Sequence, residues 1–205
     1  MKILHIALTC LFLFPSFLVA ADVPSDANLV NPIKVGQALP AITLTDMTGK
    51  AFDLNKAVAK KPAVLIVYRG GWCPYCNTHM GELAKLQPKL VDMGYQIIAI
   101  SPELPKYLKE SSEKNSLTYG LYSDSKADAI KALGLAYKVD DKTFKKLKSY
   151  DIDIERNAGE DHRILPVPAA IIVDRNGEVK FSFAAPDYTQ RVDTALLLKA
   201  AEIYK

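Results

Sequence analysis

Apolar side chains along the chain fall into two kinds of pattern, continuous runs and helical spacing. Residues 63–68 form an apolar run rich in β-branched side chains, and residues 95–100 form a second run, which is typical of strands buried on both faces. Between them, apolar positions predict a helix that begins at Cys73 and ends at Gly94, with a kink or break at Pro88. This order of elements predicts a parallel βαβ unit with a right-handed crossover.

Shorter elements are predicted on both sides of this unit. Alternating residues predict a hairpin formed by residues 41–45 and 50–54. A second hairpin is predicted from the buried run 169–173, the turn sequence D-R-N-G and residues 179–183. Further predicted elements are helices over residues 104–115, 126–133 and 189–203 and a strand over residues 119–122. In the last helix, the side chains expected to face inward are Val192, Leu196, Leu197 and Ile203.

The segment 140–160 is polar and charged, and its apolar pattern is broken. Its N-terminal half is compatible with a helix. We expect a solvated insertion and assign it no chemistry, while an element that docks a partner is the alternative.

The first 21 residues differ from the rest, because one lysine is followed by an almost continuous apolar run that ends in small residues. This pattern predicts a signal peptide over residues 1–21, cleaved after Ala21, although the run is nearly long enough for an uncleaved membrane anchor. Cleavage would remove Cys10. Residues 22–35 lack apolar periodicity and are expected to form a linker or a loosely attached N-terminal arm. One folded domain is therefore expected over residues 36–205.

The composition of the chain and its expected export limit the classes of molecule that it can bind. Apolar residues make up 49% of the chain, charged residues 24%, and the formal net charge is +3. No nucleic-acid partner and, after signal cleavage, no membrane partner is expected from this balance. The mature protein is expected in the periplasm if the source is a two-membrane bacterium, and otherwise to be secreted or membrane-tethered. Disulfides persist outside the cytosol, so a cysteine pair there raises the question of redox chemistry.

That pair is Cys73 and Cys76, in the sequence W-C-P-Y-C at the start of the predicted helix. The sulfur of Cys73 would lie near the unpaired N–H groups of the first turn, where Pro74 loses nothing by its missing N–H. Helix-start cysteines of C-x-x-C motifs have lowered pKa values, and the thiolate is the nucleophile. Cys76, one turn further in, would be more thiol-like and could resolve a mixed disulfide on Cys73. The redox group would be the Cys73–Cys76 dithiol and disulfide itself, with no further cofactor.

The sequence is less compatible with other uses of the cysteine pair. A structural zinc site needs four ligands, and only His79 lies close to the cysteines in sequence. Covalent haem requires a histidine directly after the second cysteine, where this chain has Asn77. An inert disulfide closing such a short loop would gain little stability. No metal ligands are assigned, and a non-enzymatic metal-handling module remains a rival hypothesis.

Several motifs together resemble one family. They are G-Q-A-L-P from Gly36, Y-R-G-G-W-C-P-Y-C from Tyr68, I-S-P from Ile100, the stretch from Pro168 to Gly177, and P-D-Y-T-Q-R from Pro186. In this order they resemble the peroxiredoxin-like (AhpC/TSA) branch of the thioredoxin superfamily, members with R-G-x-W-C-P-Y-C. The resemblance implies an α/β thioredoxin-like fold, with a central mixed β-sheet flanked by helices, an N-terminal β-hairpin of peroxiredoxin type and thiol-based redox activity.

The resemblance also implies site residues. Typical peroxiredoxins carry T-x-x-C, with the peroxide-attacking cysteine at the position of Cys76, and an arginine where this chain has Pro168. Both departures favour thioredoxin-like chemistry, in which a cis Val167–Pro168 bond would face the dithiol and offer a backbone edge to an extended substrate. Trp72 is expected to cap the dithiol and Tyr75 to contact partners.

Three charged residues are supporting candidates. Thioredoxins keep a buried carboxylate where this chain has Val67, so another group would have to accept protons. Glu103 is a candidate, although a solvated loop acid is the expected state. Arg69 and Arg191 could stabilise a thiolate if they approach the sulfurs, or could be ordinary surface cations.

The sequence thus predicts an exported thiol–disulfide oxidoreductase that cycles Cys73 and Cys76. The alternative enzyme is a peroxiredoxin-like antioxidant peroxidase that reduces hydrogen peroxide or alkyl hydroperoxides through a sulfenic acid. Either enzyme needs a protein or small-molecule disulfide or peroxide substrate and an external thiol as electron donor.

Overall fold

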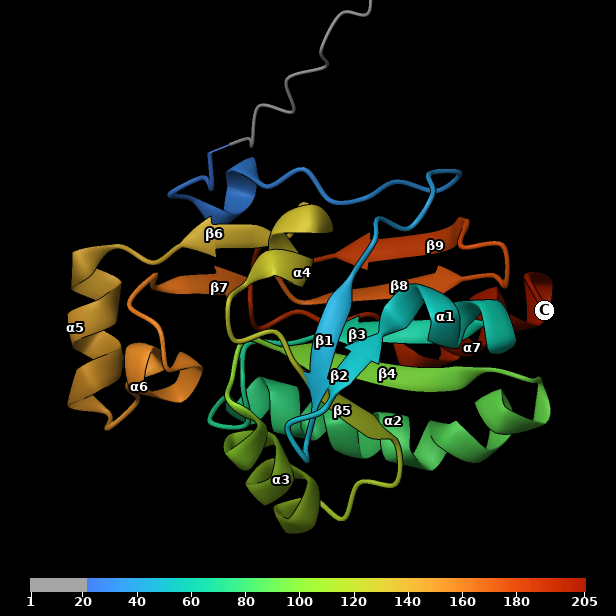
Figure 1. Cartoon of the computed structure of the whole chain (residues 1–205), viewed down its shortest axis with the longest axis horizontal. Helices are drawn as coiled ribbons and strands as arrows, with labels where there is room; N and C mark the ends of the chain where they lie inside the picture. The colour runs from blue at the N-terminus through green and yellow to red at the C-terminus, as the bar shows by residue number, and fades with distance from the viewer. Residues whose placement is uncertain (1–21) are drawn as a thin grey trace, which may run out of the picture.

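The computed structural model describes residues 22–205, so the predicted signal peptide and Cys10 lie outside the described residues. Its centre is a 7-stranded sheet in the order β2-β1-β5-β4-β3-β8-β9 (Figure 1). The strands are β1 (Thr43–Asp46), β2 (Ala51–Asp53), β3 (Ala63–Val67), β4 (Gln96–Ser101), β5 (Gly120–Ser123), β8 (Ala169–Val173) and β9 (Val179–Ala184). The helices are α1 (Leu54–Lys60), α2 (Pro74–Asp92), α3 (Pro105–Lys114), α4 (Asp128–Ala132), α5 (Asp141–Ser149), α6 (Ile154–Ala158) and α7 (Thr194–Ile203).

The predicted βαβ unit is present as β3, α2 and β4. The two strands are parallel, with Leu65 opposite Ile98 in the register. The helix α2 runs without interruption through Pro88, so the predicted break is wrong. Strand β8 pairs antiparallel on the other side of β3, which makes the sheet mixed.

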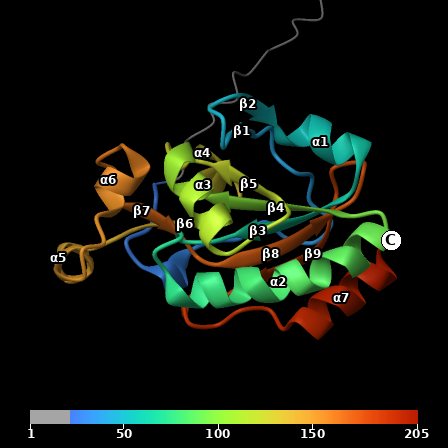
Figure 2. The same cartoon turned by 90° about the horizontal axis from the view of Figure 1, so that it is seen from below.

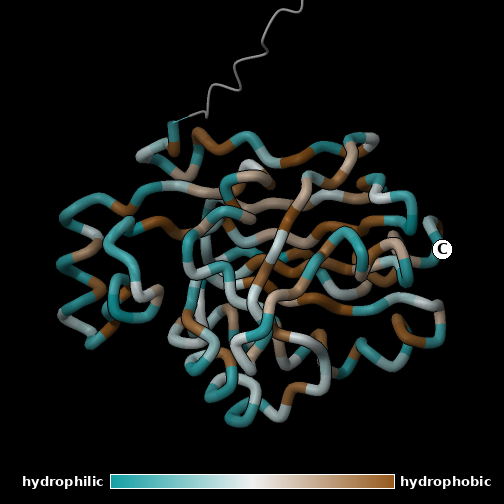
Figure 3. Tube along the Cα trace, in the orientation of Figure 1, coloured by the Kyte–Doolittle hydropathy of each residue, from teal (hydrophilic) through white to brown (hydrophobic). Residues whose placement is uncertain are grey.

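Alternate side chains of the central strands feed two separate cores. In β3, Leu65 belongs to the core beneath α1 and α4, whereas Ile66 belongs to the core beneath α2 and α7. Figure 2 shows these two helix pairs on opposite faces of the sheet. Burial on both faces explains why the central strands read as continuous apolar runs, which appear brown in Figure 3.

Both predicted hairpins are present. Strands β1 and β2 pair antiparallel, and Asp46 closes their turn by accepting from the N–H groups of Thr48 and Lys50. Strands β8 and β9 pair across the turn at Asp174, with a register irregularity near Val173. The hairpin β1–β2 joins the sheet through β5.

A second sheet was not predicted. Strands β6 (Ala136–Lys138) and β7 (Ile164–Pro166) form a 2-stranded antiparallel ribbon outside the central sheet. Between them the chain makes α5, which confirms the helix expected in the first half of segment 140–160, and α6, which was not expected. These elements enclose a third small core built around Phe144. Three-residue strands are too short to show an alternating pattern.

Two other expectations need correction. Residues 22–35 are an attached arm rather than a loose one, because Ile33 N–H donates to the Leu133 carbonyl at 2.9 Å and Val30 packs on the core. The last helix begins only at Thr194, after an Asp193 cap, and Leu196 is 51% exposed and Ile203 64% exposed. The inward positions of α7 and of the loop before it are Val192, Leu197, Ala200 and Ala201.

Across residues 22–205, the search for a helix that is both long and apolar enough to cross a bilayer finds none.

The attachment of the arm can be tested at Gly134. This glycine has a φ of +68°, and a Cβ there would lie 2.0 Å from the Asn31 carbonyl oxygen. We expect Gly134→Ala to lower the free energy of unfolding by about 2–4 kcal/mol, because the cost of the strained backbone is added to the cost of the clash with the arm. Denaturant unfolding measures the change. Gly177→Ala is the control, with a φ of +79° but open space around the new Cβ. Equal losses in the two variants would contradict the contact with the arm.

Candidate active site

The loop after β3 leads into α2 and places Cys73 at the helix start. Cys73 is the N-cap residue of α2, with φ −88° and ψ 115°, and Pro74 occupies the first turn. The Cys73 N–H donates to the Gly70 carbonyl at 3.1 Å, and the Cys73 carbonyl accepts from Asn77 N–H at 3.1 Å. The predicted placement of the pair at a helix start is thus observed.

The two thiols are free, and each is only 1% exposed, but they differ in acidity. A hydrogen bond from the Cys76 thiol lowers the pKa of Cys73 to about 6, and the charges of Arg69 and Arg191 act in the same direction. The same sulfur–sulfur hydrogen bond, followed by burial, raises the pKa of Cys76 well above its usual value. Near neutral pH the pair therefore consists of a Cys73 thiolate and a Cys76 thiol.

Both candidate arginines lie at the dithiol. Arg191 Nη2 donates to Cys76 Sγ at 3.1 Å from the loop before α7. Arg69 is only 5% exposed, and its guanidinium carbon lies 4.9 Å from the ring centre of Trp72 and 4.2 Å from that of Tyr188. Arg69 is therefore not an ordinary surface cation, since aromatic rings hold its charge beside the sulfurs.

Glu103 is buried, which corrects the expectation of a solvated acid. It is 3% exposed, and its Oε2 accepts from Gly71 N–H at 2.8 Å and from Ser101 Oγ at 3.3 Å. Burial raises the pKa of Glu103 to about 7, against the effect of these hydrogen bonds. A carboxyl group that titrates near neutral pH lies directly beneath the loop that carries Cys73.

A buried tyrosine is subject to the charges of both this carboxyl group and the inner sulfur. Tyr68 is 2% exposed, and its hydroxyl has no hydrogen-bond partner within residues 22–205. Burial raises the pKa of Tyr68, and the charges of Glu103 and Cys76 raise it further. Because charge effects weaken with distance, the Tyr68 hydroxyl must be near both groups.

The close packing of this loop requires glycine. Gly70 has a φ of +151°, and a Cβ there would lie 2.3 Å from Trp72 Nε1 and 2.9 Å from Glu103 Cδ. The glycine pair of the motif thus lets the carboxyl group and the indole approach the same stretch of backbone.

A groove of about 510 Å³ opens beside Cys73. One wall is the start of α2 and the other is α5 with the chain after it. Its lining is Arg69, Trp72, Cys73, Pro74, Tyr75, Thr143, Lys146, Leu147, Tyr150, Ile152 and Tyr188. Trp72 lies beside the dithiol as expected, and Tyr75 is 47% exposed, in agreement with a contact residue. A substrate can reach the otherwise buried Cys73 sulfur from this groove.

The structure does not bring Val167 and Pro168 into the groove. Every peptide bond within residues 22–205 is trans, so the predicted cis bond is wrong. Both residues are buried, and Val167 N–H donates to the Leu135 carbonyl at 2.8 Å. One edge of β7 is already paired with β6, and neither Val167 nor Pro168 lines the groove.

Sequence reasoning missed several groove and core residues. Tyr188 lies in the P-D-Y-T-Q-R motif, which was noted but given no role for its ring. Lys146, Leu147 and Tyr150 come from the segment that was assigned no chemistry. No local signal marks them, since only the tertiary fold brings α5 to the dithiol.

The metal hypothesis finds no ligand set in residues 22–205, where no group of three or more His, Cys, Asp or Glu side chains is placed to hold an ion. His79 is 5% exposed, and burial lowers its pKa to about 4, which keeps the ring neutral within the core.

Comparisons with known proteins agree with this architecture. The chain is 30% identical over 109 residues to peroxiredoxin bcp1 of Schizosaccharomyces pombe, a match that covers 53% of this chain and 56% of that protein. It is 26% identical over 149 residues to the thiol-disulfide oxidoreductase ResA of Geobacillus kaustophilus, with 72% of this chain and 68% of that protein covered. The chain thus spans little more than half the length of the first relative.

Solved structures show the same fold. Reduced Prx3 of Vibrio vulnificus in complex with H2O2 superimposes with a TM-score of 0.68 at 23% identity, over 84% of this chain and 98% of that one. Peroxidoxin BcpB of Mycobacterium tuberculosis superimposes with a TM-score of 0.66 at 15% identity, over 84% of this chain and 99% of that one. The predicted thioredoxin-like α/β fold, a mixed sheet flanked by helices, is confirmed. The model of the AhpC/TSA family matches residues 35–182, and the chain therefore belongs to this family.

Proposed function

We propose that the protein is a thiol–disulfide oxidoreductase in which Cys73 is the nucleophile and Cys76 the resolving thiol, and that it belongs with the R-G-x-W-C-P-Y-C members of its family. The observation that carries the proposal is the unequal acidity of two adjacent sulfurs, of which Cys73 lines an open groove. A thiolate attacks disulfides, whereas a protonated neighbour stays available for the second step.

The reaction takes place in two exchanges. The Cys73 thiolate forms a bond to one substrate sulfur, the substrate S–S bond breaks, and the other substrate sulfur leaves as a thiolate. Cys76 then loses its proton and attacks the Cys73 sulfur, which releases the second substrate thiolate. The substrate gains two electrons, and the enzyme is left with a Cys73–Cys76 disulfide. An external thiol donor returns the pair to the reduced state by the reverse exchange.

Glu103 is the proposed acceptor of the Cys76 proton. Cys76 holds its proton tightly, so its attack requires a base. Glu103 is buried, titrates near pH 7 and accepts a hydrogen bond from Ser101 Oγ, and the charges of Glu103 and Cys76 both act on the pKa of Tyr68. Glu103 also lines a second pocket of about 230 Å³. Through this pocket the proton can pass to solvent while the substrate fills the groove.

The remaining candidate residues stabilise negative charge or contact the substrate. Arg191 and Arg69 stabilise negative charge as it moves between the two sulfurs. Trp72 and Tyr75 line the groove and contact the bound substrate. Val167 and Pro168 are buried and make no substrate contact in the proposal.

A second candidate function is a thiol peroxidase, favoured by relatives that are named peroxiredoxins. Here the Cys73 thiolate attacks a peroxide oxygen, the O–O bond breaks, and water or an alcohol leaves after protonation. The resulting sulfenic acid condenses with the Cys76 thiol to form the disulfide and release water. The external thiol donor is again the source of electrons.

Export of the mature protein, to the periplasm of a two-membrane bacterium or to the outside of the cell, is proposed from the leader pattern alone. The partners are then the disulfide or peroxide substrate and the thiol donor of that compartment.

Trapping decides between the two reactions. Cys76→Ser removes the resolving thiol, so we expect mixed disulfides between Cys73 and partner proteins to accumulate, visible as reducible adducts in gels and mass spectra. Cys73→Ser is the matched control and should give none. If Cys76→Ser instead consumes peroxide rapidly with a small thiol as reductant and forms no adducts, the peroxidase is the function.

The acidity of Cys73 can be measured directly. Alkylation of Cys73 by iodoacetamide should be half-maximal near pH 6 in the wild type, because the thiolate reacts and its pKa is about 6. Cys76→Ala removes the hydrogen bond to the thiolate, and we expect the midpoint to rise by about one to two pH units. Cys76→Ser keeps a donor and should shift it less. A wild-type midpoint near that of free cysteine contradicts the proposed nucleophile.

The role of Glu103 predicts a pH dependence of the second exchange. A carboxylate accepts a proton only when ionised, so resolution of a preformed mixed disulfide should accelerate as the pH rises through about 7. In Glu103→Gln, which can still accept from Gly71 N–H, we expect resolution to slow by about 10²-fold and this inflection to disappear. Rapid-quench kinetics with alkylation measures the rate. Glu110→Gln, an exposed acid of the same pocket, should keep the inflection but move it to lower pH, because the Glu110 charge raises the pKa of Glu103. An unchanged inflection in Glu103→Gln would exclude it as the acceptor.

A further inference from the structure

The insertion between β6 and β7 forms the second wall of the groove at Cys73. Lys146 and Leu147 of α5, followed by Tyr150 and Ile152, face the start of α2 across this groove. We propose that the insertion selects the substrate of the exchange, and that this substrate is a protein disulfide whose cysteine is flanked by apolar and acidic residues. The inference rests on the proposed function and adds its substrate class.

The position of the insertion relative to the dithiol is fixed by several contacts. Arg163 donates to Asp141 of α5 at 2.7 Å and to Glu155 of α6 at 2.6 Å, so one guanidinium joins the two helices. The Asn157 carbonyl accepts from Leu104 N–H at 2.8 Å, directly after Glu103. Trp72 packs against both the α2-side core and the small core around Phe144. These contacts therefore hold the insertion in a fixed position beside the dithiol.

The groove combines an apolar lining with positive charge. Its cationic lining residues are Arg69 and Lys146, no Asp or Glu lines it, and its anionic group is the Cys73 thiolate itself. Asp151, between Tyr150 and Ile152, is not a lining residue, and its carboxylate lies 4.0 Å from Arg156. This surface fits an apolar side chain accompanied by a carboxylate.

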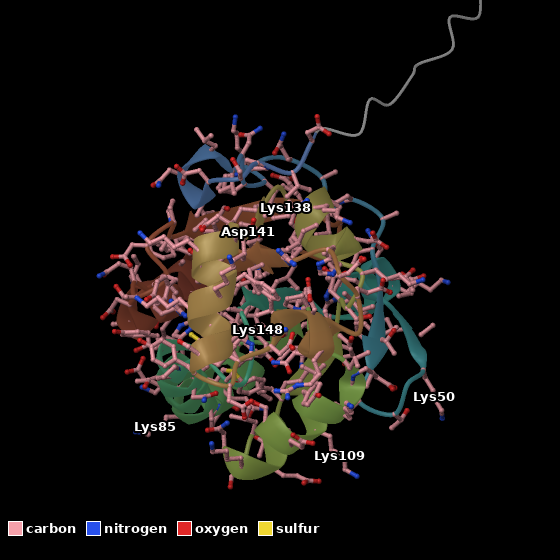
Figure 4. All side chains as sticks on the ribbon, turned by 90° about the vertical axis from the view of Figure 1, so that its left-hand side faces the viewer. Lys50, Lys85, Lys109, Lys138, Asp141 and Lys148 are labelled. Carbon is pink, nitrogen blue, oxygen red and sulfur yellow. The ribbon has the colours of Figure 1, made fainter. Side chains whose placement is uncertain are left out.

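The charges of α5 that have no ion-pair partner among the described residues are all positive. Figure 4 looks onto this helix, with Asp141 and Lys148 labelled. Asp141 is paired with Arg163 and Lys148 with Asp153. Among the described residues, no ion pair engages Lys142, Lys145 or Lys146, all of which are exposed. A partner that approaches this helix therefore meets net positive charge.

A protein segment fits this surface better than a small anion does. Three tyrosines stand at the rim, with Tyr75 47% exposed, Tyr150 65% and Tyr188 45%. Exposed aromatic side chains around an apolar pocket are typical of protein interfaces. Since residues 164–168 do not line the groove, the segment is recognised there through its side chains rather than by backbone pairing with β7.

Peptide dimers joined by one disulfide test the proposal with the reduced full-length protein. The sequences E-L-C-L-E, K-L-C-L-K and E-G-C-G-E differ only in charge or apolar content. Each reduction rate is divided by the rate with β-mercaptoethanol, which corrects for intrinsic reactivity. We expect the acidic apolar dimer to react roughly tenfold faster than either other dimer at low salt, with the advantage over the basic dimer shrinking at high salt.

Charge reversal on α5 gives the matched comparison. Lys146→Glu should reverse the preference between the acidic and basic dimers, and Lys146→Gln should abolish it. Lys109→Glu makes the same charge change on α3, outside the groove, and should keep the wild-type preference. Circular dichroism checks that all variants are folded.

Three results would overturn the inference. Equal normalised rates for the acidic and basic dimers would remove the substrate class while disulfide exchange stands. Faster reduction of oxidised glutathione than of the acidic apolar dimer would assign the groove to a small anionic disulfide. Failure to reduce any disulfide would remove the proposed function and this inference together.

Discussion

One hydrogen bond between two sulfurs determines what the rest of this structure can do. Two buried thiols in contact cannot both ionise, so the pair shares a single negative charge. The start of α2 and the bond from the Cys76 thiol place this charge on Cys73, the sulfur that lines the groove. Arg191 touches the other sulfur, where negative charge arises later in the exchange. The site thus has a direction, with attack at the groove and resolution inside.

The topology explains how a carboxyl group reaches this pair although Val67 offers none. Strands β3 and β4 are parallel neighbours, so their C-terminal ends meet at one edge of the sheet. The loop after β3 carries the cysteines, and the loop after β4 carries Glu103, which bonds to the first loop at Gly71. A buried acid is costly unless its oxygens are hydrogen-bonded, and the Gly71 and Ser101 donors supply that compensation.

Features that depend on neighbouring residues in the chain could be predicted from the sequence. Central strands buried on both faces, the hairpins and a cysteine pair at a helix start each leave a signal within a few residues. The burial of Glu103 could not be predicted, because it depends on a loop 32 residues away in sequence. The groove was missed for the same reason, as Lys146 meets Cys73 only in the folded chain. In α7, Ala200 and Ala201 face the core beside Leu197, so the large side chains of Leu196 and Ile203 were wrong indicators of the buried face.

The pairing of β6 with β7 changes how a substrate can be recognised. A free strand edge binds any extended chain through backbone groups, so it selects weakly by sequence. Here one edge of β7 is paired with β6, and the insertion between these two strands supplies a groove wall with apolar and cationic side chains. Side-chain recognition depends on residue type, because an unmatched charge or an empty apolar pocket weakens binding. Because the insertion builds one wall of the groove at Cys73, recognition at this sulfur depends on side chains and is therefore selective.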